Sequence, residues 1–267
     1  KELKKINIKN EFLEKLDKIL PEHDVKFYRN IPEYFKNIFE QNKSLVSNNF
    51  SLRIDINGDW NDYKKNVKKK RLHDARRQRK RLQEKGELKF VIINSKENIN
   101  NFYNVFFIQK SKRYISTGVK DIFKNLKLKK FYKNFSNNHS ERMHLSMLML
   151  DNEILATHWG VIRNKKFYFL MPTFSDKWSR YSPGRLLMEE LIHWCHDKGF
   201  GVFDFTIGDE GYKYEWSNSE EKLYNIIEAY SWRGKAYLIF LKARETLKNI
   251  KTLKSLVLLF RKNFQFL

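Results

Sequence analysis

Hydrophobic and polar positions in the second half of the chain follow first the spacing of strands and then that of a helix. Three apolar segments separated by polar turn residues predict strands joined by hairpins: residues 143–150, 154–163 and 166–171. Apolar residues then recur at helical spacing over 182–198, and a short apolar run over 202–207 stops at Gly208. A final strand is predicted over 223–230. This order predicts an antiparallel three-stranded sheet followed by a helix and a further strand.

The first half of the chain is less regular and combines helices with strands. Helical spacing of apolar and aromatic residues predicts helices in four segments: residues 12–20, 34–39, 97–112 and 121–135. Two shorter segments, 51–56 and 88–93, have the apolar content of strands. The C-terminal segment 232–267 is predicted to be helical and is basic.

The segment 60–85 is the most basic part of the chain, with twelve lysines or arginines in one predicted helix. Asp59 or Asn61 can cap its start, and Gly86 can end it. Two interpretations remain open: a solvated helix whose aliphatic stems cover apolar neighbours, and a track for the phosphates of nucleic acid or lipid. Because no RNA-binding fingerprint or zinc-finger spacing accompanies the segment, we favour a solvated helix or a phosphate-guiding surface.

Composition and charge narrow the functional classes. The chain has 267 residues, 41% of them hydrophobic, which is enough for a core in one large domain or two small ones. Its net charge of +22 predicts attraction to polyanions, which include nucleic acid, anionic membranes and phosphorylated small ligands. Cys195 is the only cysteine, which excludes an internal disulfide and favours a reducing compartment. No apolar run approaches the roughly 20 residues of a membrane-spanning helix. Lys1 at the start leaves open that a native N-terminal segment has been removed.

The stretch 181–216 carries the candidate chemistry. Ser182 is a predicted N-cap, Pro183 occupies the first helical position, and Gly184 allows close approach to the backbone. Unpaired N–H groups and the positive end of the helix dipole at such a start favour a phosphate. The strand 202–207 then leads into an acidic and aromatic loop, so this stretch predicts a ligand site.

The segments SPGRLLMEELIHW and FDFTIGDEGYKYEW, together with the upstream basic helix, resemble the CelD/BcsL-type branch of the GNAT acetyltransferase superfamily. That branch is related to the FemABX peptidoglycan aminoacyltransferases, whose chains carry two GNAT-like halves. The resemblance covers residues 60–230. It implies an α/β (α+β) GNAT fold, with a mixed, largely antiparallel sheet flanked by helices and with two GNAT-like halves. The implied regions are a degenerate GNAT-like half over 1–135, an acyl-CoA-binding half over 136–235, and a basic helical tail over 236–267.

In this superfamily the strands before and after the helix splay apart, and these are residues 167–173 and 202–207 here. The resemblance implies that backbone N–H groups near Leu170 and Met171 polarise the thioester carbonyl of acetyl-CoA or another acyl-CoA. The implied seat of the pyrophosphate is a turn of five residues: Tyr181, Ser182, Pro183, Gly184 and Arg185. The usual turn has more glycines and more backbone donors than this one. Pro183 removes one donor, whereas Arg185 adds a charged contact.

Direct attack of an amine on a thioester requires a group that takes the proton of the amine. Three side chains are catalytic candidates for this role: Asp209, Glu210 and His158. Each has a structural explanation as well, because loop carboxylates often pair with a cation such as Lys213, and a single histidine beside Trp159 is more often a packed residue. For His158 the structural explanation is favoured. The resemblance to Fem-type enzymes implies that Lys213 stabilises negative charge during acyl transfer.

Three aromatic side chains are the candidate substrate-binding residues: Tyr168, Tyr212 and Trp216. Salt bridges of Lys213 and core packing of the rings are the alternative explanation. His193 and His196 lie three residues apart on the predicted helix, but no carboxylate or cysteine set completes a metal site, so no metal is expected.

The resemblance implies a transferase that moves an acetyl or other short acyl group from acyl-CoA to the amine of an amino sugar. The implied acceptor is in particular a nucleotide-linked sugar of surface polysaccharide biosynthesis. The first alternative is Fem-like transfer of an amino acid from aminoacyl-tRNA to a cell-wall precursor. The second is a catalytically inactive GNAT scaffold that binds a polyanion or a membrane. The expected partner is a small-molecule acceptor and not a stably bound nucleic acid. The expected location is cytoplasmic, with peripheral membrane contact through the basic tail.

Overall fold

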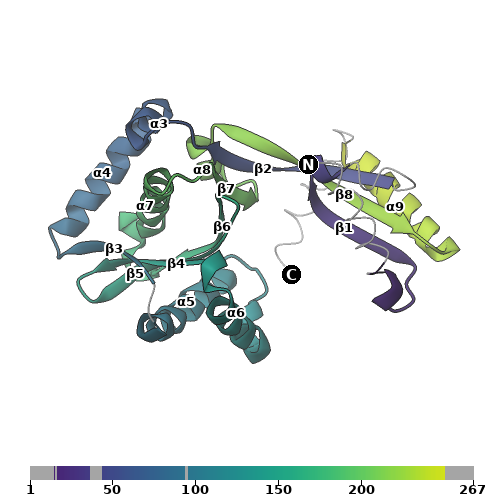
Figure 1. Ribbon diagram of the computed structural model, residues 1–267, viewed down its shortest axis with the longest axis horizontal. Coiled ribbons are helices and arrows are strands. Elements are labelled where there is room, and N and C mark those ends of the chain that lie inside the picture. Colours follow the sequence, from purple (N-terminus) through teal and green to yellow (C-terminus); the bar gives the residue numbers. More distant parts are fainter. Residues whose placement is uncertain (1–14, 16, 37–43, 94–95, 250–267) are drawn as a thin grey trace, which may run out of the picture. The chain divides into compact units, whose positions relative to one another are not determined.

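The computed structural model describes residues 15, 17–36, 44–93 and 96–249, which form two compact units (Figure 1). One unit is Leu52–Glu220. The other combines the described parts of Lys1–Ser51 and Glu221–Leu267. No helix among the described residues is long and apolar enough to cross a membrane.

The unit Leu52–Glu220 is built on a mostly antiparallel sheet. Four strands pair antiparallel in chain order: β3 (Leu88–Ile92), β4 (Met143–Leu150), β5 (Glu153–Arg163) and β6 (Lys166–Phe174). β7 (Val202–Ile207) joins β6 in parallel. The turn between β5 and β6 has positive φ at Asn164 and Lys165, which the tightest two-residue hairpins require. The hairpin strands predicted from the periodicity are therefore confirmed.

Helices cover both faces of this sheet (Figure 1). Two pack against one face: α5 (Lys96–Ser116) and α6 (Leu126–Asn138). Three lie on the other side: α3 (Trp60–Asn66), α4 (Lys69–Gln83) and α7 (Pro183–Asp197). The α5 face has an aromatic core that includes Phe102, Phe106 and Phe123, and α7 buries Leu187 and Cys195. Close packing on both faces holds the sheet, and with it the ends of β6 and β7, in place.

The strands β6 and β7 pair only over their first residues. Their register runs from Lys166 opposite Val202 to Tyr168 opposite Asp204, and the two strands diverge after that. Thr206 has a positive φ of 60°, and its N–H donates to Oδ1 of Asp204 at 2.7 Å. This local turn changes the direction of β7. In the described residues β6 and β7 therefore separate, as the resemblance to the GNAT superfamily implied.

The other unit contains β1 (Val25–Pro32), α2 (Glu33–Lys36) and α9 (Trp232–Asn249). β1 pairs antiparallel with β8 (Ser219–Ala229), and both β8 and β2 (Ser44–Asp55) run from one unit into the other. In the described residues, hydrogen-bonded neighbours follow the order β1-β8-β2-β7-β6-β5-β4-β3.

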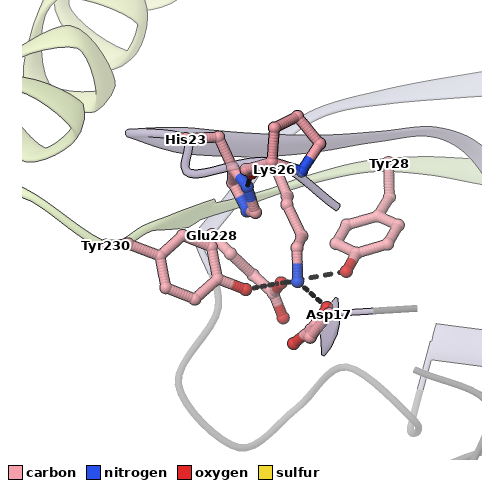
Figure 2. A network of polar contacts seen from close by, with 7 residues as sticks. Asp17, His23, Lys26, Tyr28, Glu228 and Tyr230 are labelled. Atoms are coloured by element: carbon pink, nitrogen blue, oxygen red, sulfur yellow. Dashed lines mark hydrogen bonds and ion pairs between the residues drawn. The ribbon is translucent and has the colours of Figure 1, made fainter. Parts of the chain in front are cut away.

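A polar network lies on β1 and β8 (Figure 2). The carboxylate of Glu228 accepts a hydrogen bond from the hydroxyl of Tyr28 at 2.9 Å and another from the hydroxyl of Tyr230. The ammonium of Lys26 lies 4.0 Å from the same carboxylate and also pairs with Asp17. Because Lys26 is only 7% exposed, its charge depends on these carboxylates.

Three expectations about secondary structure were wrong. The predicted helix 60–85 is two helices, because Val67 is extended and buried between α3 and α4. The predicted helix 121–135 is a 3-10 turn, Ile122–Lys124, followed by α6. The strand predicted over 51–56 is confirmed as the end of the longer β2, whereas β1 was not predicted. The acidic and aromatic loop contains a short helix, α8 (Gly211–Trp216).

Other expectations were met, or lie beyond the described residues. Asp59 caps α3, because its Oδ1 accepts the N–H of Asp62 at 2.8 Å. Part of the predicted helix 12–20 and the end of the helix 34–39 lie outside the described residues, as does the tail after Asn249.

The network of Glu228 provides a stability test. Replacement of Glu228 by Leu leaves Lys26 and two tyrosine hydroxyls without their shared acceptor, so we expect the free energy of unfolding to fall by about 3 kcal/mol. Tyr230→Phe removes one hydrogen bond, and we expect a loss of about 1 kcal/mol. Urea unfolding of both variants measures these values. Equal losses in the two variants would contradict a central role for the carboxylate.

Candidate active site

A cavity of about 460 Å³ lies where β6 and β7 separate. Helix α5 contributes Lys110 and Arg113, and β6 contributes Leu170 and Pro172. The remaining polar lining comes from the 3-10 turn before α7, from the start of α7, from β7 and from the segment after β7: Ser179, Ser182, Arg185, Thr206, Glu210, Tyr212 and Lys213. Since α5 and α7 lie on opposite faces of the sheet, the cavity has one wall from each face (Figure 1). Residues far apart in sequence therefore meet at a single gap.

A β-bulge shapes the β6 wall of the cavity. The register of β6 against β5 steps from Tyr168 opposite Val161 to Met171 opposite Trp159, which leaves one extra residue on β6. Leu170 lies in this bulge and is 38% exposed. Its backbone is also beyond the last pair between β6 and β7. A bulge beside an unpaired edge is where a strand can offer backbone N–H groups to a ligand.

Lys213 is the most deeply buried charged group of the cavity, with 3% of its surface exposed. Its Nζ donates to the carbonyl of Ile207 at 3.0 Å and lies 2.9 Å from Oε2 of Glu210. Gly208 makes this arrangement possible. A Cβ at Gly208 would lie 2.3 Å from Oε2 of Glu210 and 2.8 Å from Nζ of Lys213, and its φ of 134° disfavours any side chain. The pair of Lys213 and Glu210 is thus built by the local backbone.

Two cations of the cavity, Lys110 and Arg113, were not among the candidates from the sequence. The Nζ of Lys110 donates to the carbonyl of Pro172 at 3.2 Å. The pKa of Lys110 is lowered to about 8, mainly by burial and to a smaller extent by nearby Arg113, while Glu210 opposes both effects. The guanidinium of Arg113 lies 5.7 Å from the ring of Phe174. The spacing of these basic residues, one turn apart on an aromatic-rich helix, was the available signal.

The predicted phosphate turn fits a diphosphate only in part. Ser182 occupies the N-cap position of α7, as predicted, but it has a positive φ of 52° and makes no side-chain cap hydrogen bond. The N–H of Ser182 donates to Ser179 and that of Arg185 donates back to Ser182, while Pro183 has no N–H. Gly184 packs closely on Phe174, because a Cβ there would lie 3.0 Å from that ring. The turn therefore offers the backbone of Gly184 and the side chain of Arg185, and not a row of N–H donors.

Several candidate residues lie away from the cavity lining. The carboxylate of Asp209 accepts a hydrogen bond from the hydroxyl of Tyr214 at 2.6 Å and is exposed. Trp216 is buried, and its carbonyl accepts the hydroxyl of Tyr63. Tyr181 is buried beside Arg180.

His158 is fully buried on β5. Its ring stacks on Phe169 at 4.7 Å, and neither ring nitrogen has a hydrogen-bond partner among the described residues. Burial holds the pKa of His158 well below its ordinary value, so the ring stays neutral. By contrast Tyr212 lines the cavity, and burial raises the pKa of its hydroxyl to about 12, with a smaller effect of Glu210.

The two histidines of α7 have structural partners. His193 stacks on Trp60 at 4.9 Å, and Nδ1 of His196 lies 3.4 Å from the carbonyl of Gly58. In the described part of the chain, no group of three or more histidine, cysteine or acidic side chains has the geometry to hold a metal ion.

Residues 69–214 match the sequence profile of a family described as "Acetyltransferase (GNAT) domain". This match covers more than half of the chain. The chain belongs to the GNAT acetyltransferase family. It is therefore an acyltransferase, and the α/β GNAT fold with a mostly antiparallel sheet is confirmed. The cavity lies largely within the matched segment, since its lining runs from Lys110 to Lys213.

Solved structures share this fold at low sequence identity. FemX is similar with a TM-score of 0.63 at 9% identity, over 88% of this chain and 79% of its own. L-PGS from Bacillus licheniformis is similar with a TM-score of 0.54 at 12% identity, over 83% of this chain and 72% of its own. A protein of unknown function from Bacteroides thetaiotaomicron has a TM-score of 0.56 at 11% identity, over 83% and 75%. A search of curated proteins found no match to the GNAT chain.

Gly208 and Gly211 form a matched pair for testing the site. We expect Gly208→Ala to displace the pair of Lys213 and Glu210 and to lower the free energy of unfolding by about 2 kcal/mol, because of the steric conflict and the positive φ. Gly211→Ala has no neighbour within 4 Å of the added Cβ and serves as the control. Unfolding by urea and acyl-transfer rates measure both effects. If Gly208→Ala changed neither the free energy of unfolding nor the acyl-transfer rate, the backbone at Gly208 would not be what positions Lys213.

Proposed function

We propose that this GNAT protein transfers an acetyl or other short acyl group from acyl-CoA to the amine of a phosphate-bearing amino sugar. The observation that carries the proposal is the cavity between β6 and β7. Four cationic side chains line it, Lys110, Arg113, Arg185 and Lys213, together with one carboxylate, Glu210. Such an excess of positive charge in a partly closed space favours an anionic ligand. A nucleotide-linked sugar of surface polysaccharide assembly, the acceptor class associated with the CelD/BcsL type, has both the amine and the phosphates.

The proposal gives different residues of the cavity different roles in the reaction. Acyl-CoA supplies the activated acyl group as a thioester. The backbone at the Leu170 bulge donates to the carbonyl oxygen as negative charge develops on it. Lys213, held by Ile207 and Glu210, adds a fixed positive charge to the same region. Tyr212 at the cavity wall contacts the acceptor. All these groups are preorganised by hydrogen bonds or packing, which is what charge stabilisation in a transition state requires.

Arg185 is the proposed contact for the phosphates of acyl-CoA, together with the backbone of Gly184. Because the N–H groups of Ser182 and Arg185 are already hydrogen-bonded and Pro183 has none, the guanidinium is the main group of the turn that can bind an anion. The proposal places the reaction in the cytoplasm, where acyl-CoA is available, and the basic tail would make any contact with the membrane.

A second candidate is Fem-like transfer of an amino acid from aminoacyl-tRNA to a cell-wall precursor. The same turn favours it, because an ester at the end of a tRNA needs no seat for a CoA diphosphate. The likeness to the fold of FemX, and to L-PGS, is compatible with it. The amine chemistry in the cavity would be the same, and only the donor would differ.

Arg185 separates the two donors. With acyl-CoA as donor, we expect Arg185→Gln to raise KM for the donor about tenfold with little change in kcat, because the lost charge contacts a part that does not react. Arg163→Gln, an exposed arginine at the end of β5, is the control. Rates with acetyl-CoA and with aminoacyl-tRNA, each with an amino-sugar or peptide amine as acceptor, identify the donor. Turnover with aminoacyl-tRNA alone would replace the first candidate by the second.

Lys213→Met tests the proposed charge stabilisation. We expect kcat to fall about 100-fold while the donor still binds, since the lost contact acts on charge that develops in the reaction. Lys198→Met, at an exposed position after α7, is the control. Isothermal titration with the donor and single-turnover rates separate binding from chemistry. A Lys213→Met variant with unchanged kcat would contradict this role.

A further inference from the structure

Acyl transfer to an amine releases a proton, and the candidates from the sequence are poorly placed to accept it. Asp209 is exposed and bonded to Tyr214. His158 is enclosed between aromatic rings, and its ring nitrogens have no hydrogen-bond partner among the described residues. The carboxylate of Glu210 lies 2.9 Å from the ammonium of Lys213. This carboxylate is already engaged as the ion-pair partner of Lys213. The proton therefore needs another acceptor.

Lys110 is a half-buried amine that reaches the cavity from α5. Its Nζ is 3.2 Å from the carbonyl of Pro172, two residues beyond Leu170 on β6. This hydrogen bond uses one N–H and fixes the nitrogen at the cavity wall beside the β-bulge. A neutral lysine amine in this position keeps a lone pair for a proton. Lys110 lies on the α5 side, whereas the proposed contact for the donor, Arg185, comes from α7 on the opposite face (Figure 1).

The groups around Lys110 disfavour its protonated form. Burial lowers the pKa of Lys110 most, and the nearby cation Arg113 on α5 lowers it as well. The carboxylate of Glu210 raises it. The pKa of about 8 leaves roughly one lysine in ten as the free amine at pH 7 and half at pH 8. Among the described residues, other titratable or charged groups also line the cavity or interact with Lys110: Tyr114 on α5, with its ring 5.3 Å from Nζ, His158 on β5, Arg185 on α7, and Tyr212 and Lys213 on α8.

We propose that Lys110, as a free amine, takes the proton from the attacking amine of the acceptor. This role rests on the proposed acyl transfer. The acceptor nitrogen forms a bond to the acyl carbon, and the bond from that carbon to the sulfur of the thioester, or to the oxygen of an aminoacyl ester, breaks. The proton of the attacking nitrogen moves to Nζ of Lys110. The resulting ammonium then gives a proton to the leaving thiolate or alkoxide, which restores the free amine. The products are the amide and the free thiol or alcohol.

A different role for Lys110 is a fixed cation that binds an acceptor phosphate. The two roles predict different behaviour of Lys110→Arg. An arginine keeps the positive charge but stays protonated at every accessible pH, so it can bind a phosphate and cannot accept a proton. Lys110→Met removes both properties with a side chain of similar length. Lys112 is exposed on the same helix, and Lys112→Arg and Lys112→Met are the matched controls.

The test is the pH dependence of kcat in the wild-type protein and in these variants, from pH 6 to 9.5, with saturating donor and acceptor. For the wild type we expect kcat to rise with pH through a midpoint near 8, because the free amine forms as the pH rises through this pKa. We expect both Lys110→Arg and Lys110→Met to lose about 100-fold in kcat and to lose this midpoint. Urea unfolding of each variant identifies losses that come from misfolding. Wild-type kcat and an unchanged pH profile in Lys110→Arg would overturn the proton-acceptor role in favour of the fixed cation.

A second measurement does not depend on turnover. Titration of the lysine side chains by NMR, with Lys110→Arg to assign the signal, gives the pKa of Lys110 directly. We expect this lysine to titrate near pH 8, well below the ordinary value of 10.5. A pKa of 10 or more would overturn the proposal even if acyl transfer is observed. Absence of transfer by the wild type with either donor would instead overturn the proposed function, and with it the role of Lys110.

Discussion

The separation of β6 from β7 is the constraint on which the candidate site depends. Two parallel strands that diverge leave backbone N–H and C=O groups without partners, and such groups must be satisfied when they are buried. In this protein, charged side chains satisfy three of them. Asp204 accepts the N–H of Thr206, Lys213 donates to the carbonyl of Ile207, and Lys110 donates to the carbonyl of Pro172. Two of these three side chains also line the cavity, so the groups that stabilise the gap are also the groups available for chemistry.

This arrangement explains why a cavity with excess positive charge is stable. A buried lysine is unfavourable unless its ammonium has hydrogen-bond partners and a counter-charge. Lys213 has both, in Ile207 and Glu210. Lys110 has a carbonyl and only the more distant influence of Glu210, and burial, with a smaller effect of Arg113, lowers its pKa. One carboxylate thus acts on two lysines to different extents, and a charged group and a proton acceptor can exist in one cavity.

The basic helix α4 has two faces with different environments. Its inner arginines pair with carboxylates of the same unit: Arg71 with Glu215 after the cavity segment, and Arg79 with Glu189 and Glu190 on α7. These ion pairs connect α4 to the elements that form the cavity. Its outer basic residues are exposed, among them Lys69, Lys70, Arg76, Lys80 and Arg81. The net charge of the chain therefore combines residues that hold the fold with residues that give its surface a positive potential.

The periodicity of apolar residues was sufficient to predict the helices and strands that bury one regular face. The hairpin strands, α7 and β7 each bury a regular set of apolar residues, so local spacing was sufficient to predict them. The segments 181–185 and 209–216 were also predicted to be the ends of a ligand site, and the structure brings parts of both to one cavity.

Tertiary contacts decided the rest. Strand β1 is stabilised by pairing with β8, almost 200 residues later in the sequence, and the break at Val67 follows from burial of that side chain. The role of Ser182 depends on the 3-10 turn, Asp176–Tyr181, that precedes it. In the sequence, Lys110 looks like any surface lysine of an aromatic-rich helix. Only the packing of α5 against β6 brings its amine to the carbonyl of Pro172. The sequence alone was sufficient to predict the fold family, whereas the protonation state of a lysine in the cavity depends on burial and on charges that only the folded chain brings together.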